Sequence, residues 1–144
     1  MLNEINSFCM SLNEEERRAI VALELDKVDK TLAQLDVQLQ ANLWDMAANR
    51  LYYALFHAVS ALLVSDHHAV GTHRGAVNQF NLYYIKEGVF SKEEGRLYSR
   101  LQRLREEGDY NCSIDVEQEE VEEKIEPTRQ LIAKIKQYIE EKGV

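Results

Sequence analysis

The longest apolar run of the chain, NLWDMAANRLYYALFHAVSALLVS, covers residues 42–65 and constrains the fold more than any other stretch. Read with the 3.6-residue period of an α-helix, its apolar and small side chains occupy nearly every direction around the axis. A helix of this kind in water must be covered by neighbours on several sides. We therefore expect a central helix of a bundle over these residues, with Asn42 as its N-cap.

Two polar side chains in this run need a physical reason. Arg50 and His57 are seven residues apart, which places them on one face of the helix, about 10.5 Å apart along its axis. A cation and a titratable ring on a buried face indicate a polar core network, a subunit interface or a functional cleft. Residues 51–64 are too few to cross a bilayer, which takes about 20 apolar residues, so no membrane association is expected.

Residues 12–40 carry an apolar stripe in steps of three and four, which predicts a helix opened by an Asn13–Glu16 or Ser11–Glu14 capping box. The stripe consists of Val21, Leu25, Val28, Leu32, Leu35 and Leu39. Charged side chains between these positions are expected to face solvent, namely Glu24, Asp26, Lys27, Asp29 and Lys30.

A loop is expected over residues 65–72. The next helix should begin near Thr72 and end at Gly88 in a left-handed cap. A reciprocal S-x-x-E box at Ser91 opens a further helix, which Gly108 is expected to end.

The last helix is expected to begin at an Asp115–Gln118 cap, and Pro127 should kink it or divide it in two. Alternating β-branched runs are absent, so no strand is expected. The sequence therefore predicts an all-α fold, an up-and-down bundle of four to five helices in one domain over residues 1–144, with residues 1–11 as an arm or short helix.

The charge balance excludes some functions. The chain carries 17 basic and 25 acidic residues, a net charge of −8, which argues against a surface that binds nucleic acid all over but permits a local basic patch. Cys9 and Cys112 fit no metal-binding or redox spacing, so we expect free thiols in a reducing cytoplasm.

Two neighbouring segments have opposite charge. Residues 91–105 have a net charge of +3, and residues 115–126 have a net charge of −6. Either the two helices neutralise each other or face water, or the first carries an anion-binding row in which Arg100, Arg103 and Arg105 are available for phosphate.

The histidines allow two interpretations. His57 is either a core histidine satisfied by a hydrogen bond or a catalytic or ligand-binding group. His67, His68 and His73 lack a metal-binding spacing, so we expect no metal and no cofactor. The tyrosines are expected in the core or at an interface.

Three segments taken together resemble the HEPN-domain family, in its small stand-alone prokaryotic branch. They are ANRLYYALFHAVSALL at 48–63, THRGAVNQF at 72–80 and LREEGDY at 104–110. The resemblance implies a bundle of four or five helices that is often dimeric, and a link to nucleotide or RNA chemistry. Many relatives are toxins paired with a nucleotidyltransferase antitoxin. Catalytic members are metal-independent ribonucleases with an R-x(4–6)-H motif, whose arginine stabilises phosphate and whose histidine moves the 2′-hydroxyl proton.

The chain departs from that motif at Arg105, because no histidine follows at the required spacing. Asp109 and Tyr110 stand there instead, and near neutral pH one is too acidic and the other too weak a base to replace histidine. Arg50 and His57 match R-x6-H in letters only, and His73 is the other histidine on a characteristic family position.

Two arrangements of these residues remain open. In one, Arg105 and Asp109 approach Arg50, His57 or His73 in a composite site. In the other, a buried Arg50–Asp109 ion pair has a structural role.

Two functional hypotheses follow. The first is a non-catalytic HEPN-type module, a cytoplasmic homodimer that binds a nucleotide, an RNA or a nucleotidyltransferase partner. Its candidate binding residues are Arg50, His57, His73, Arg100, Arg103, Arg105, Asp109 and Tyr110. The second is a metal-independent ribonuclease toxin that uses Arg105 with His57 or His73.

Overall fold

The computed structural model describes residues 12–110 and 115–143, so the expected arm at residues 1–11 and both cysteines lie outside the described residues. The described part contains five α-helices, one π-helical turn and no strand. In chain order they are α2 (Glu14–Gln40), α3 (Trp44–Ser65), α4 (His73–Phe80), the π-turn η1 (Asn81–Ile85), α5 (Lys92–Tyr110) and α6 (Gln118–Glu141). The all-α prediction is confirmed.

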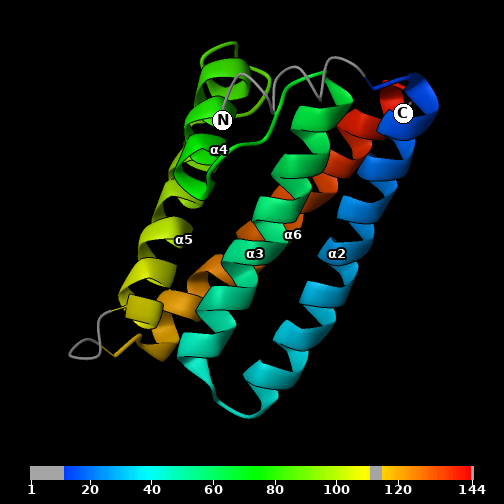
Figure 1. The fold of residues 1–144 in the computed structure, drawn as a ribbon. Coiled ribbons are helices and arrows are strands. Elements are labelled where there is room, and N and C mark those ends of the chain that lie inside the picture. Colours follow the sequence, from blue (N-terminus) through cyan, green and yellow to red (C-terminus); the bar gives the residue numbers. More distant parts are fainter. Residues whose placement is uncertain (1–11, 111–114, 144) are drawn as a thin grey trace.

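The helix α3 lies at the centre of the bundle. Figure 1 shows α2 on one side of it, α4 and α5 on the other, and α6 behind. The long helices α2, α3, α5 and α6 alternate in direction, and α3 contacts α2, α4, α5 and α6. This is the expected up-and-down arrangement.

Most of the 22 residues of α3 are buried, and they form the middle of the hydrophobic core. From Leu51 to Ser65, the side chains of Tyr53, Phe56 and His57 alone remain partly exposed. The remaining α3 side chains in this segment face the stripes of α2, α5 and α6, where Val28, Leu101 and Ile135 are each fully buried. The predicted enclosure of the central run is therefore confirmed, with one face left partly open.

The predicted starts of three helices, at Asn13, Thr72 and Ser91, are confirmed by capping hydrogen bonds. The Asn13 side chain accepts a hydrogen bond from the Glu16 backbone at 2.8 Å, and the Ser91 backbone donates to Glu94 Oε1 at 2.8 Å. The Thr72 hydroxyl accepts from the Gly75 backbone at 2.9 Å. These contacts satisfy N–H groups that have no partner within their own helices.

Two expectations about helix ends are wrong. Asn42 does not cap α3: it adopts a left-handed conformation with φ 57°, and Leu43 is the N-cap residue. Gly108 does not end α5, which continues to Tyr110. A Cβ at Gly108 would lie 3.2 Å from the Val116 side chain, so the glycine here lies at a close approach of the chain and does not end the helix.

The last helix also differs from expectation. Its N-cap is Glu117, which makes no side-chain capping bond, so the predicted Asp115–Gln118 cap is wrong. Pro127 lies inside α6 without dividing it. Packing of Val121, Ile132 and neighbouring apolar residues keeps the helix continuous across the missing backbone donor.

No helix in the described ranges is both long enough and apolar enough to cross a membrane.

The core position of α3 leads to a stability prediction. Leu62→Ala removes a fully buried side chain and should lower the free energy of unfolding by about 2–5 kcal/mol. Leu23→Ala, at a side chain that is 55% exposed on α2, is the matched control and should change it by less than about 0.5 kcal/mol. Urea denaturation followed by circular dichroism measures both, and equal effects would contradict the central placement of α3.

Candidate functional site

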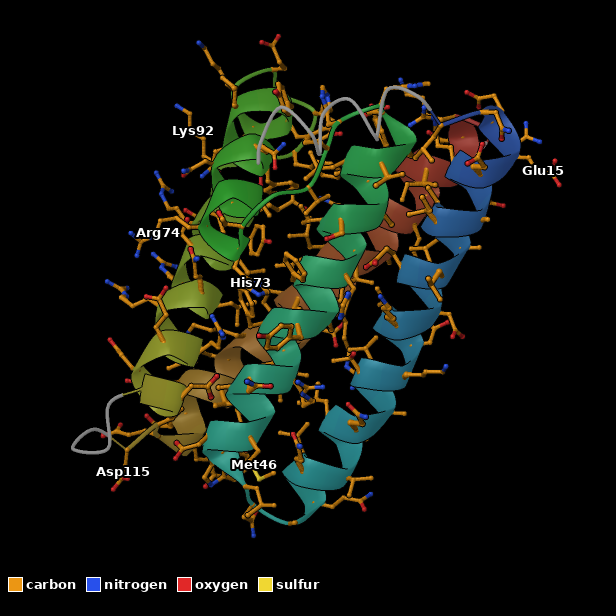
Figure 2. All side chains as sticks on the ribbon, in the orientation of Figure 1. Glu15, Met46, His73, Arg74, Lys92 and Asp115 are labelled. Atoms are coloured by element: carbon orange, nitrogen blue, oxygen red, sulfur yellow. The ribbon has the colours of Figure 1, made fainter. Side chains whose placement is uncertain are left out.

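The partly open face of α3 brings together most of the residues singled out from the sequence. Its exposed side chains recur every three to four residues and contact residues of α2, α4 and α5. Figure 2 shows Met46 at the start of this face and His73 on the side of α4 that is turned toward it. We call the polar part of this face the α3 site. It consists of Asn49, Arg50, Tyr53 and His57 of α3, Glu24 and Gln34 of α2, His73 of α4, and Arg105 and Asp109 of α5.

Tyr53 is the centre of the α3 site. The Cζ atoms of Arg50 and Arg105 lie 5.2 Å and 5.3 Å from the centroid of its ring. Arg105 Nη2 also donates to the Tyr53 hydroxyl at 3.2 Å. Two guanidinium groups from different helices are thus held against one half-buried ring by cation–π attraction.

Arg105 is buried, with 8% of its surface exposed. Its Nε lies 3.4 Å from Asp109 Oδ2, one helical turn further along α5. Asn49 Nδ2 donates to the same carboxylate oxygen at 2.8 Å. Asp109 therefore balances the charge of Arg105 and ties α5 to the second turn of α3.

Arg50 is held differently, by neutral partners. Its Nε and Nη2 donate to Asn49 Oδ1 at 3.0 Å and 2.6 Å, and its Nη1 donates to Gln34 Oε1 at 2.8 Å. Among the described residues no carboxylate lies within ion-pair distance of Arg50. The alternative of an Arg50–Asp109 ion pair is therefore wrong, because the Asn49 amide lies between the two groups.

His57 forms a pair with Glu24. Its Nδ1 lies 2.8 Å from Glu24 Oε2, and 20% of the His57 side chain is exposed. Burial alone would raise the pKa of Glu24, but hydrogen bonds from His57 and Lys27 outweigh burial and hold that pKa below its usual value. The expectation that Glu24 faces solvent is wrong, since it lies on the stripe between Val21 and Val28.

His73 packs on the aromatic part of α3. Its ring centroid lies 4.5 Å from that of Phe56 and 5.5 Å from that of Tyr53. Its Nδ1 is buried without a hydrogen-bond partner in the described structure. Burial, then the charge of Arg105, and then that of His57 lower the pKa of His73, so its ring is neutral near neutral pH.

The arginines of α5 point in different directions from the helix. Arg105 points into the α3 site, whereas Arg100 and Arg103 are exposed on the outer faces of α5. Arg100 and Arg103 line a groove with Glu120 and Glu123 of α6, yet neither arginine comes within ion-pair distance of a carboxylate in the described ranges. The alternative in which Arg100, Arg103 and Arg105 form one phosphate-binding row is therefore wrong.

The structure thus brings together Arg50, His57, His73, Arg105 and Asp109, and it separates Arg100 and Arg103 from them. The side chain of Tyr110 lies outside the described residues. In the described ranges no three histidine, cysteine, aspartate or glutamate side chains are grouped to hold a metal ion.

Sequence reasoning missed Asn49, Gln34, Glu24 and the central role of Tyr53. A signal existed for Glu24, which falls three residues after Val21 and four before Val28, and so on the buried side of α2. The contacts of Asn49 and Gln34 join helices far apart in the chain, and no local pattern marks them.

The arrangement is suited to holding an anion. Arg50 is the basic residue of a groove of about 690 Å³, which is also lined by the carboxylates of Asp45 and Asp109 and by the amides of Asn49 and Gln38. Guanidinium groups recognise carboxylate and phosphate through their planar set of donors.

The family sequence model of the HEPN domain matches residues 22–138 of this chain. A "UPF0332 protein" of Thermotoga maritima is 37% identical over 95 residues, which cover 66% of this chain and 72% of the relative. Two proteins of Methanocaldococcus jannaschii are also similar. "Putative toxin MJ0605" is 30% identical over 130 residues, covering 90% of this chain and 96% of the relative. "Putative toxin MJ0142" is 25% identical over 120 residues, covering 83% and 82%.

The matched range runs from the first half of α2 to the last turns of α6 and includes every residue of the α3 site. On this match, and on the helical bundle built around α3, the chain belongs to the HEPN domain family.

Proposed function

We propose that this chain is a toxin-like HEPN module that binds phosphate groups of a nucleotide or an RNA at the α3 site without cleaving it. One observation carries the proposal: the half-buried Arg50 is held by the neutral amide oxygens of Asn49 and Gln34 and not by a carboxylate. A half-buried positive charge that no neighbouring carboxylate balances favours an anionic ligand.

The groove beside Arg50 has room for such a ligand, which would contact the guanidinium group and not the carboxylates of Asp45 and Asp109 on the same wall. The groove volume of about 690 Å³ is within the usual range for small-molecule sites, about 300–1,000 Å³. Incoming phosphate oxygens would replace the two amide oxygens as acceptors and add charge to the hydrogen bonds. Arg105 contributes little net charge, because Asp109 already balances it.

A longer RNA would extend to the outer surface of α5. Arg100 and Arg103 are exposed there and pair with no carboxylate of the described residues, so they are available for phosphate contacts. Lys92 lines a groove with both arginines, and Figure 2 shows it pointing away from α3. These contacts would position a backbone without reading its sequence.

The relatives support a protein partner. Because two relatives are named as toxins, we propose that this chain pairs with a nucleotidyltransferase-type antitoxin. We also propose that two copies of this chain form a homodimer.

Substitution of Arg50 tests its role in binding RNA. Arg50→Met keeps much of the side-chain volume, removes the charge, and should weaken binding of a labelled single-stranded RNA about tenfold or more, the value of one charge-assisted hydrogen bond. Arg18→Met, at an exposed α2 position outside the α3 site, is the charge-matched control and should bind like the unmutated chain. Fluorescence anisotropy at low salt measures all three proteins. Equal losses in the two variants would reject a specific site at Arg50.

The second prediction separates the two basic regions. The double variant Arg100→Gln, Arg103→Gln should leave the affinity for a mononucleotide unchanged and lower the affinity for a longer RNA. Its plot of log affinity against log salt should become shallower by about 1.4, since single strands lose about 0.7 in slope per phosphate contact. An unchanged slope for the longer RNA would show that the outer face of α5 is not used.

A ribonuclease is the second candidate, and the Glu24–His57 pair favours it. A carboxylate that accepts from Nδ1 leaves His57 Nε2 as the basic nitrogen, and no described residue hydrogen-bonds that atom. Arg50 and, from α5, Arg105 both lie against Tyr53 on this face of α3, where they could stabilise phosphate. In this arrangement His57 is the base and the arginines are the cations, in place of the missing motif histidine.

The third prediction distinguishes cleavage from binding. Under the proposed binding function, RNA incubated with the purified chain and a metal chelator stays intact on a denaturing gel. Under the second candidate it is cleaved, His57→Ala abolishes cleavage, and Glu24→Gln lowers it about 10- to 100-fold by removing the negative charge that stabilises the protonated imidazole. Cleavage that survives in His57→Ala would reject the second candidate as well.

A further inference from the structure

A second groove lies where the end of α3 meets η1 and the last turn of α6, at the opposite end of α3 from Arg50. Its volume is about 530 Å³. We call it the Asp66 groove and define it by Asp66, His68, Tyr83, Tyr138 and Lys142. None of these residues takes part in the α3 site.

Asp66 is held firmly from one side. The hydroxyl groups of Tyr84 and Tyr138 donate to Asp66 Oδ2 at 2.8 Å and 2.9 Å. Burial and the contact with Asp66 raise the pKa of both tyrosines, so both hydroxyls stay protonated donors. Because Oδ2 accepts both bonds, Oδ1 is the oxygen of this carboxylate that remains for a further partner.

The π-turn places two consecutive tyrosines in different roles. Tyr84 is buried and contacts Asp66, while the partly exposed Tyr83 stacks on His68 with ring centroids 3.9 Å apart and planes 3° apart. Burial lowers the pKa of His68, so its ring is neutral near neutral pH. Short π-turns within helices frequently occur at functional sites.

A cation already occupies part of this groove. Lys142 Nζ lies 4.0 Å from Asp66 Oδ1 and 5.1 Å from the centroid of the Tyr138 ring. The Lys142 side chain is 52% exposed and follows the last residue of α6, so it is held loosely. Its position marks the point where a carboxylate and an aromatic face both attract positive charge.

We propose that the Asp66 groove binds the guanidinium group of an arginine side chain on a partner protein, which displaces Lys142. A planar guanidinium stacks on the Tyr138 ring, where Lys142 Nζ now lies, and donates to Asp66 Oδ1 at the same time, which a compact ammonium group does less well. Tyr83 forms a further wall of the groove. Glu87 adds a second carboxylate at the rim. The net charge of −8 also favours the approach of a basic segment.

The test uses the full chain and a short acetylated, amidated peptide with one arginine between glycines. In an NMR titration of the ¹⁵N-labelled chain, the peptide should shift the amide signals of residues 66–68, 82–87 and 138–142. Lys142→Ala removes the competing cation and should bind the peptide about two- to fivefold more tightly, and Tyr83→Ala should bind it more weakly by a similar factor. The same peptide with citrulline, which is neutral and nearly the same shape, should not bind.

A matched control removes the general effect of charge. Lys136→Ala changes the net charge by the same amount as Lys142→Ala, but Lys136 pairs with Asp29 of α2 at 2.8 Å, away from the groove. Its affinity for the arginine peptide should equal that of the unmutated chain. Equal gains in the two lysine variants, equal binding of the citrulline peptide, equal binding of a lysine peptide, or signal shifts outside the groove would each overturn the proposal. These outcomes are independent of whether the α3 site binds phosphate.

Discussion

The apolar surface of α3 has to be removed from water on most sides, and this requirement determines where polar chemistry can lie. The helices α2, α5 and α6 cover the apolar directions, and only the face with Arg50, Tyr53 and His57 stays partly open. A charged side chain on a covered side would have to be desolvated and paired at high cost. The hydrophobic effect that encloses α3 therefore also concentrates the polar groups of this helix into one stripe.

The two arginines of the α3 site, Arg105 of α5 and Arg50 of α3, differ in how their charge is balanced, although both lie against the Tyr53 ring. Arg105 is deeply buried and has a carboxylate partner, as burial of an ion requires. Arg50 is less buried and is held by amides, so its positive charge reaches the groove. The first arginine fixes the position of Tyr53 between α3 and α5, and the second is left for a ligand. The neutral state of His73 keeps a third positive charge out of this crowded space.

Local signals in the sequence were sufficient for the helices, and long-range contacts were not accessible from it. The Asn13 and Ser91 boxes were readable because their partners lie three residues away. Asn49 contacts a residue 60 positions away, and its partner could not be deduced from any period or spacing. The local preference of asparagine for an N-cap failed at Asn42, and the alternative that Pro127 divides the last helix failed because packing on both sides of the proline keeps α6 continuous. The same residue types that indicated a site at Arg50 and His57 could not show which carboxylate belonged to which cation.

The position of Asn49 gives the hydrogen-bond network of the α3 site a fixed direction. Its oxygen receives the guanidinium donors of Arg50, and its nitrogen donates to the carboxylate of Asp109. Turning the amide over would bring oxygen against oxygen on one side and N–H against N–H on the other, so only one orientation is stable. An aspartate at this position would repel its acidic neighbour, and a leucine would leave groups on two helices without partners. The neutral Asn49 side chain carries both an acceptor and a donor, so it can lie between Arg50 and Asp109 and bond to each. It thereby prevents a direct ion pair that would neutralise the charge of Arg50.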